Sequence, residues 1–291
     1  MDLLPLRNPV VVWWLAMSLC SAVNVGVWLA LAWSARREFT GDGEDDRLHL
    51  RMVALAGVYT LICAFRSLVP RADVQRLTLF DGWLATVLVG RTVATIAELA
   101  FVAQWALALD RTAKLAGVRA ARAIAAAALV AISVAECFSW YAVVTTNYFG
   151  HVVEESLWAA VGLGAVVASA LLYPRFRGTI QRVLAACIAS ALGYVAFMVL
   201  HDVPMYLGRW HADLLAGRSY LTLWEGLRDI ATRRVVTWEI GAWREEIPWM
   251  SFYFTVAVWF SLALCTVSLR PASVAPFLRA RAGSKPEQPA R

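Results

Sequence analysis

Charged side chains are scarce in this chain. Asp, Glu, Lys and Arg together make up 16% of its 291 residues, against about 25% in an ordinary soluble domain. Hydrophobic residues make up 60%, more than a soluble surface can accommodate. The excess of basic residues does not indicate nucleic-acid binding, because the arginines lie mainly in short loops between apolar runs. The composition therefore predicts a membrane protein and excludes nucleic acid as a partner.

Lysine is almost missing. It occurs at Lys114 and Lys285 alone, and neither lies in the last apolar run. A retinal protein needs a Schiff-base lysine in its last span, so that class is excluded. The metal and redox motifs H-x-x-x-H, H-E-x-x-H and C-x-x-C are also missing. No family resemblance emerges from the motifs, and function has to be argued from individual side chains.

Long apolar segments are what the chain does have. Seven runs are long enough to cross about 30 Å of hydrocarbon, which takes roughly 20 helical residues. They cover about 9–33, 49–69, 83–109, 119–143, 153–173, 180–203 and 249–269. We therefore expect an all-α bundle of seven transmembrane helices in one membrane domain, 1–270. The first run is longer than the core of a signal peptide and is expected to remain as a span.

The basic residues predict an orientation. Lys and Arg gather in the loops after the first, third and fifth runs and in the C-terminal tail. Because such loops stay on the cytoplasmic side, we expect the N-terminus outside and the C-terminus in the cytoplasm. The richness in Ala, Val and Arg indicates a bacterial protein, and so the inner (plasma) membrane. Residues 271–291 are expected to be a disordered cytoplasmic tail.

The longest loop, 206–248, is predicted to form an extracytoplasmic cap. A loop of this length usually has structure or function of its own. Tyr220, Trp224, Leu227 and Ala231 recur at helical spacing, which predicts an amphipathic helix on the outer surface. An ordinary aromatic belt at the membrane interface is the alternative.

Ionisable residues of five spans fall toward the outer end of the predicted bundle. A charge at mid-membrane costs roughly 2.5–3.5 kcal/mol, so such a group implies mutual pairing, a wet cavity or a bound cation. We expect Glu154 to be an interfacial charge at a helix N-terminus rather than part of a site. The remaining residues are the candidates for a polar site: Arg66, Arg91, Glu98, Glu136, His151, Glu155, His201 and Asp202.

Three roles are predicted for these residues. Glu98 and Glu136 are the candidate general acid and base. The candidate substrate-binding groups are Asn147 together with two arginines that suit a phosphate or carboxylate, Arg66 and Arg91. His151 and Glu155, four residues apart on one helix face, could bind a divalent metal ion as a cofactor. The full set of predicted metal ligands is His151, Glu155, His201 and Asp202.

Structural ion pairs are the plain alternative for the same charges. Arg91 and Glu98 share a helix face at a separation of seven residues, too long for a direct i, i+4 pair. They, or Arg66 with Glu136, could simply fix helix packing. A mid-span Asn24 is typical of an interhelical hydrogen bond, although it could also join a cavity.

The expected function is a membrane-embedded enzyme or binding protein for a lipid or another amphiphile, held in an outward-facing polar cavity. Two alternatives stay open. The same cluster could relay protons or bind a ligand in a transporter or receptor, or it could lock helices together in an accessory subunit of a membrane complex. The expected partners are membrane lipids, an amphiphilic small molecule, and a membrane protein or further copies of the chain.

Overall fold

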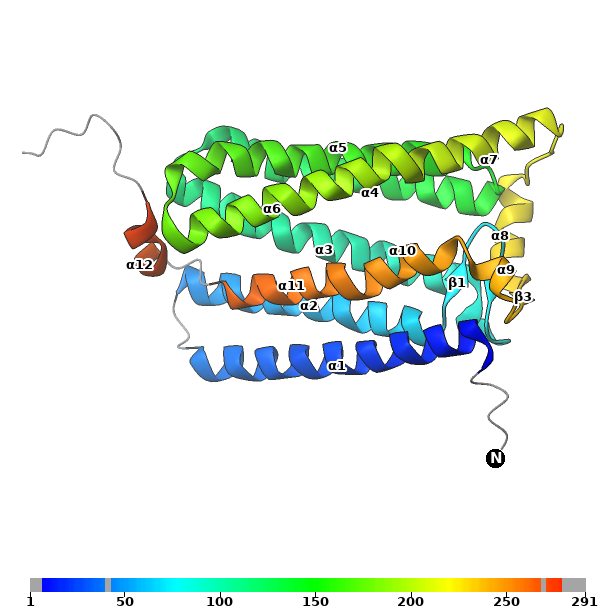
Figure 1. The fold of residues 1–291 in the computed structure, drawn as a ribbon, viewed down its shortest axis with the longest axis horizontal. Coiled ribbons are helices and arrows are strands. Elements are labelled where there is room, and N and C mark those ends of the chain that lie inside the picture. The colour runs from blue at the N-terminus through cyan, green and yellow to red at the C-terminus, as the bar shows by residue number, and fades with distance from the viewer. Residues whose placement is uncertain (1–6, 40–42, 268–270, 279–291) are drawn as a thin grey trace, which may run out of the picture.

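The computed structural model describes residues 7–39, 43–267 and 271–278. Within these residues, seven helices are long and apolar enough to span a membrane, as the sequence predicts. They lie side by side along the long axis of the molecule (Figure 1). The first five are α1 Pro9–Glu38, α2 Glu44–Leu68, α3 Val87–Ala116, α4 Arg119–Thr145 and α5 Phe149–Leu172, the last extended by η3 Tyr173–Arg175.

The sixth and seventh spans each consist of two α-helices joined by a π-helical turn. The sixth runs through α6 Gly178–Phe197, η4 Met198–Asp202 and α7 Val203–Leu215, so that it continues well beyond the predicted end at residue 203. The seventh runs through α10 Glu246–Phe252, η5 Tyr253–Ala257 and α11 Val258–Thr266. The first π-turn ends two residues before Pro204, which has no N–H to donate to the preceding turn.

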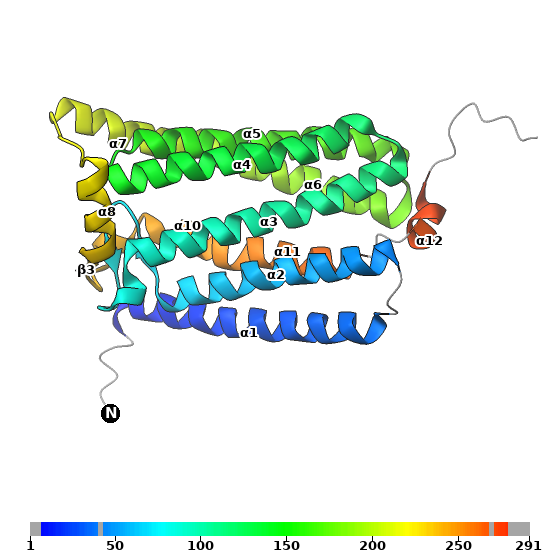
Figure 2. The same ribbon diagram turned by 180° about the vertical axis from the view of Figure 1, so that it is seen from behind.

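Helix α3 is the centre of the bundle. Helices α4, α5 and α6 lie on one side of it, and α1, α2 and α10–α11 lie on the other (Figures 1 and 2). Consecutive helices pack on one another from α1 to α6, and α11 returns to pack on α2. Helix α6 packs chiefly on α5, and α11 packs chiefly on α2 and α1. The two ends of the helix row therefore do not close into a ring.

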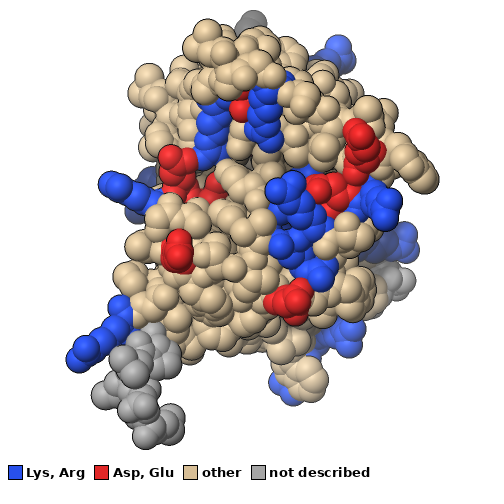
Figure 3. Space-filling model, turned by 90° about the vertical axis from the view of Figure 1, so that its right-hand side faces the viewer, with Lys and Arg blue, Asp and Glu red and all other residues tan. Residues whose placement is uncertain are grey.

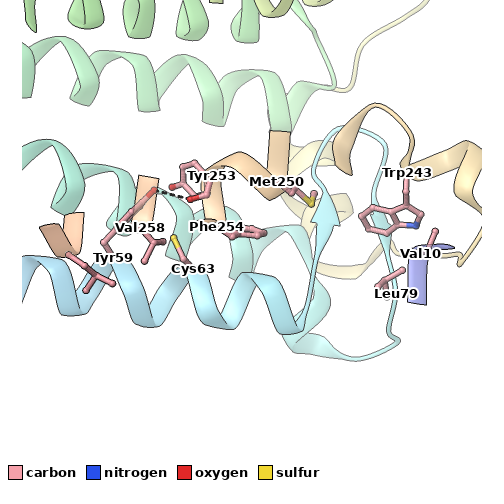
Figure 4. Packing of buried hydrophobic residues seen from close by; sticks show 11 residues of the cluster. Val10, Tyr59, Cys63, Leu79, Trp243, Met250, Tyr253, Phe254 and Val258 are labelled. Carbon is pink, nitrogen blue, oxygen red and sulfur yellow. Dashed lines mark hydrogen bonds between the residues drawn. The ribbon is translucent and has the colours of Figure 1, made fainter. Parts of the chain in front are cut away.

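The π-turn in the seventh span leaves carbonyl groups that side chains of neighbouring helices bind. The hydroxyl of Tyr59 on α2 donates to the carbonyl of Tyr253 at 3.4 Å (Figure 4). Nδ2 of Asn24 on α1 donates to the carbonyl of Phe254 at 3.2 Å, and Asn24 accepts from Trp259 at 3.0 Å. Asn24 therefore connects α1 to the seventh span by interhelical hydrogen bonds.

One end of the bundle carries a small folded cap, made of residues 69–86 and 216–245. It holds a three-stranded sheet in which β1 Arg71–Ala72 is antiparallel to β2 Leu77–Thr78, and β2 is parallel to β3 Val235–Val236. It also holds η2 Trp83–Ala85, α8 Leu223–Thr232 and α9 Ile240–Trp243. The sheet is an addition to the predicted all-α fold. Trp243 is fully buried and packs with Val10 and Leu79 beneath this cap (Figure 4).

Helix α8 lies within the segment that the sequence predicts to be helical, and two residues of its predicted apolar face are exposed. Trp224 and Leu227 are 80% and 47% exposed, whereas Ile230 is fully buried. Gly226 lies directly on the carbonyl of Val144 at the end of α4, a contact that a Cβ would prevent. Close approach at Gly226, rather than the apolar stripe, therefore sets the rotation of α8. Seen from this end, basic and acidic side chains are interspersed on the surface of the cap (Figure 3).

The opposite end of the bundle carries a short segment after the seventh span. Pro271–Val274 forms α12 and Ala275–Phe277 forms η6. Leu278 pairs with Phe176 as an isolated bridge. The predicted disorder of the tail falls otherwise on residues 279–291, which lie outside the described residues.

Candidate functional site

Arg91 is the centre of a buried ionisable cluster. It lies one turn inside the cap end of α3 and is 6% exposed. Its Nη2 lies 2.7 Å from Oε2 of Glu136 on α4, 3.2 Å from Oε2 of Glu98 on α3 and 3.4 Å from Oε1 of Glu154 on α5. Three helices are thereby joined by one guanidinium group. We call Arg91, Glu98, Glu136, His151, Glu154 and Glu155 the ionisable cluster.

One of these contacts agrees with the alternative of a structural ion pair, and another corrects an expectation. Arg91 and Glu98 do form an ion pair, because the combined reach of two long side chains covers the roughly 10 Å that separates residues seven apart on a helix. Glu154 is 3% exposed and central, rather than an interfacial charge. Helix α5 begins at Phe149 and not near 153, so Glu154 lies in the second turn, inside the bundle.

Glu136 is held by more than the arginine. Thr95 Oγ1 donates to Oε2 of Glu136 at 2.5 Å, and Trp140 Nε1 donates to that hydroxyl at 3.1 Å. Its other oxygen, Oε1, is buried without a hydrogen-bond partner among the described residues. An unpaired buried carboxylate oxygen is costly and is available to a ligand or a proton.

His151 and Glu154 form a pair on one face of α5. Nδ1 of His151 lies 2.6 Å from Oε2 of Glu154, and the imidazole ring packs on that of Tyr206 at 4.8 Å between centroids. The carboxylate therefore fixes the orientation of the ring. The neighbouring Glu155 is 8% exposed and has no ion pair or hydrogen bond among the described residues.

The remaining predicted residues are divided between the site and its surroundings. Asp202 is buried on η4, which packs on α5. His201 is exposed and packs on the ring of Phe197, so it is not brought together with the other predicted metal ligands. Asn147 lies in the α4–α5 turn, where it donates to the hydroxyl of Tyr141 at 3.2 Å.

Arg66 does not pair with Glu136. Its guanidinium lies over the rings of Tyr253 and Phe254, 5.6 and 5.7 Å from their centroids. In the described part of the chain, no carboxylate lies within ion-pair distance of it. Such cation–π contacts leave the N–H donors of the guanidinium free to bind an anion.

A cavity of about 810 Å³ adjoins the cluster and runs along the bundle. It lies between α5–α6 on one side and α10–α11 on the other, where the helix row fails to close. The apolar residues Val183 on α6 and Phe252 and Val256 on the seventh span line it and are 40%, 44% and 43% exposed. The cavity therefore opens sideways, through a cleft between α6 and the seventh span.

The lining of this cavity changes along its length. On α3 it begins with Arg91 and Glu98 and continues with Phe101, Trp105, Ala108 and Leu109. On α5 it begins with His151, Glu154 and Glu155 and continues with Trp158, Val161, Gly162, Ala165 and Leu172. Both helices run away from the cap, so both change from ionisable to apolar in the same direction. The cavity is ionisable at the cap end and mainly apolar beyond it, where Thr112 and Ser169 are its polar lining residues on these two helices.

Arg71 of the cap also lines the polar end of the cavity, and sequence reasoning missed it. It is 3% exposed, its Nε donates to Asp73 at 3.0 Å and its Nη1 donates to the carbonyl of Thr86 at 2.5 Å. Its guanidinium occupies the place where a Cβ at Gly90 would lie. Burial lowers the pKa of Arg71 to about 10, against the opposing effect of Asp73, and the positive charges of Arg66 and Arg91 lower it further.

Two groups of side chains could hold a metal ion. His151, Glu154 and Glu155 each offer a ligand atom, and these atoms lie within 4.8 Å of one another. The same holds for Glu98, Glu136 and Glu154. The second group already surrounds the guanidinium of Arg91, which takes the place of a cation there. The first group is therefore the better fit for a metal ion.

Seven apolar helices around a buried ionisable cluster make this chain an integral membrane protein. No family model matches it, and comparisons with curated proteins and with solved structures found no match.

Proposed function

We propose that this protein takes up a lipid or another amphiphile through the lateral cleft and presents its head group to the ionisable cluster. The observation that carries the proposal is the cavity of about 810 Å³, ionisable at the cap end and mainly apolar beyond. Such a lining suits a molecule with one polar and one long apolar part. The apolar stretch of α5 from Glu155 to Leu172 is roughly 25 Å long. The hydrocarbon of one leaflet is about 15 Å thick, so this stretch is long enough to accompany the apolar part of a lipid.

The cluster has the groups for acid–base chemistry on that head group. Glu98, which lines the cavity, and Glu136, which is buried and is not among its lining residues, are the proposed general acid and base, and Arg91 contacts both. His151 adds a second proton-exchanging group: Glu154 holds its Nδ1, which leaves Nε2 for proton transfer. The protein is on this account a membrane-embedded enzyme or a binding protein, and the same groups would serve either.

For the orientation, we propose that the cap lies outside the cell. The arginine-rich loops favour the opposite end as the cytoplasmic one. The polar end of the cavity is then the end nearer the outer side of a bacterial inner membrane, with the N-terminus outside.

A metal-dependent enzyme is the second candidate, favoured by the His151, Glu154 and Glu155 group. One imidazole nitrogen and two carboxylates on consecutive turns are a donor set that suits a divalent ion such as zinc. The group lines the cavity, so a metal ion held there would face the head group. It would act on the amphiphile as a Lewis acid.

Two alternative functions remain. The protein could be a transporter or receptor, or it could be an accessory subunit of a membrane complex. An enzyme, a binding protein, a transporter and a receptor would each hold a ligand in the cavity. An accessory subunit needs no ligand there. Occupancy is therefore the property that separates these classes.

The experiment is native mass spectrometry of the protein purified in mild detergent, with extraction and identification of retained amphiphiles. Ala165→Trp fills the apolar half of the cavity, and Ala126→Trp, on the exposed face of α4, is the matched control. We expect wild type and the control to retain an amphiphile and Ala165→Trp to lose at least about tenfold in occupancy, since an indole takes up the space of the chain. Equal occupancy in all three, or no retained or added amphiphile in folded wild type, contradicts the proposal.

A further inference from the structure

The polar end of the cavity has two poles of opposite charge. Arg66 and Arg71 line it next to the cap, where Asp73 pairs with Arg71 and Glu246 also lines the cavity. Glu98, Glu154 and Glu155 line it further along. A head group that enters this end therefore meets both signs of charge.

The basic pole has hydrogen-bond donors that the protein does not use. Arg66 makes cation–π contacts and no ion pair among the described residues. Nη2 of Arg71 also lacks a hydrogen-bond partner in the described part of the chain, but it is enclosed against the backbone of Gly90, so Arg71 contributes its positive charge and Arg66 contributes the donors open to a ligand. Together this charge and these donors suit a phosphate or carboxylate oxygen.

The acidic pole has a carboxylate that the protein does not neutralise. Glu98 and Glu154 share Arg91, but Glu155 has no partner among the described residues although it is 8% exposed. Glu155 is therefore the group within the cavity that most needs a cation.

Tyr253 lies between the two poles. Its ring is beneath the guanidinium of Arg66 at 5.6 Å, and its hydroxyl donates to Oε1 of Glu98 at 3.4 Å. One tyrosine side chain thus separates Arg66 from Glu98, and Glu154 lies within 4.8 Å of both Glu98 and Glu155. The two signs of charge therefore lie along one continuous wall of the cavity, which fits one ligand with both signs of charge better than two separate ligands.

We propose that the ligand is a zwitterionic amphiphile of the phosphoethanolamine type, with its phosphate at Arg66 and Arg71 and its primary ammonium at Glu155. This assignment rests on the proposed function, since it names the head group of the molecule in the same cavity. A purely anionic head group would leave Glu155 unpaired and face further carboxylates. A purely cationic one would leave the donors of Arg66 and the charge of Arg71 without a partner.

The test compares two lipids with identical chains: phosphatidylethanolamine and its N-acetylated form, which keeps the phosphate and lacks the ammonium. Binding to full-length protein in detergent is measured for wild type, Glu155→Gln, Arg66→Gln and the exposed control Arg51→Gln. We expect wild type to prefer the ammonium form by about tenfold, the worth of one charge-assisted hydrogen bond. Glu155→Gln removes this preference, Arg66→Gln weakens both lipids alike, and Arg51→Gln changes neither.

Equal binding of the two lipids by wild type overturns the proposal without any variant. So does a preference that persists in folded Glu155→Gln, or a stoichiometric metal ion bound at Glu155. Failure of the underlying function looks different, because then folded wild type retains no amphiphile of any kind in native mass spectrometry. Retention of another amphiphile while neither of these two lipids binds overturns the head-group assignment alone.

Discussion

Arg91 on α3 lies 2.7 Å from Glu136 on α4, Nη2 to Oε2, with both side chains shielded from solvent. The pair connects α3 to the half of the bundle formed by α4, α5 and α6. It lies in an apolar layer, where an unpaired charge is costly. Glu98 and Glu154 share the same guanidinium, so the arginine is a structural element as well as part of the site.

Removing Arg91 should destabilise the fold strongly. Arg91→Gln leaves three buried carboxylates without their cation, and we expect a loss of about 3–5 kcal/mol. Thermal unfolding in detergent, followed by circular dichroism, measures it. The double variant Arg91→Gln/Glu136→Gln should recover part of the loss, because one of the stranded charges is gone. A single variant as stable as wild type would show that the ion pairs do not hold the helices.

Glu154 and Glu155 are adjacent in sequence but should respond differently to neutralisation. Glu154→Gln weakens contacts to both Arg91 and His151, and we expect a loss of about 1.5–3 kcal/mol. Glu155→Gln removes a charge without a described partner and should leave stability within about 0.5 kcal/mol of wild type or raise it. Parallel thermal unfolding of the two variants checks this. Equal destabilisation would contradict the different roles assigned to them.

The sequence could predict the spans and most of the cluster, because both follow from long-range patterns. Seven apolar runs predict seven helices, and the opposite directions of successive spans bring Arg91, Glu98 and Glu136 to one depth. Finer features depend on local geometry. Consecutive helical residues point about 100° apart, so His201 and Asp202 could not both face inward, and only Asp202 is buried.

The strands of the cap are a part of the fold that the sequence could not predict. Strands of two residues are too short for a hydrophobic period, so Arg71–Ala72 and Val235–Val236 left no signal. The inward position of Arg71 depends on space above Gly90, which no local pattern reveals.

Gly90→Ala should displace Arg71. The new Cβ would occupy the site of the guanidinium, and we expect a loss of about 1–3 kcal/mol from overpacking. Gly26→Ala on α1 is the matched control, since no atom lies within 4 Å of its added Cβ, and it should be neutral or stabilising by about 0.5–1 kcal/mol. Thermal unfolding compares the two. If both behave alike, Arg71 does not depend on the missing side chain.

The cap helix α8 should respond to acid at its first turn. The backbone N–H of Thr222 and then its hydroxyl donate to Glu225 and lower the pKa of that carboxyl. A lowered pKa in the folded state means that Glu225 stabilises the fold above its unfolded pKa of about 4.3 and loses this effect as the pH falls through the folded value. The difference in melting temperature between wild type and Glu225→Gln should therefore be largest at neutral pH and shrink as the pH falls from about 4.3 through the lowered pKa of the folded state. A constant difference would refute the capping role.

Elemental analysis decides the metal candidate. If a divalent ion is bound, purified wild type holds it near stoichiometrically, and His151→Ala and Glu155→Gln lose it. His201→Ala, with its exposed ring, is the control and should keep it. A folded wild type without metal after purification in metal-supplemented, chelator-free buffer removes this candidate and leaves acid–base or binding roles for the cluster.

Entry of an amphiphile between α6 and the seventh span is the step on which the proposed function depends. Photolabelling tests it most directly, with a lipid that carries a diazirine in its acyl chain, followed by mapping of the labelled residues. We predict label on cavity-lining residues that include Trp158, Ala165 and Ala191, with competition by excess unlabelled lipid. Label confined to outward-facing residues such as Leu19 and Val130, without competition, would contradict the account.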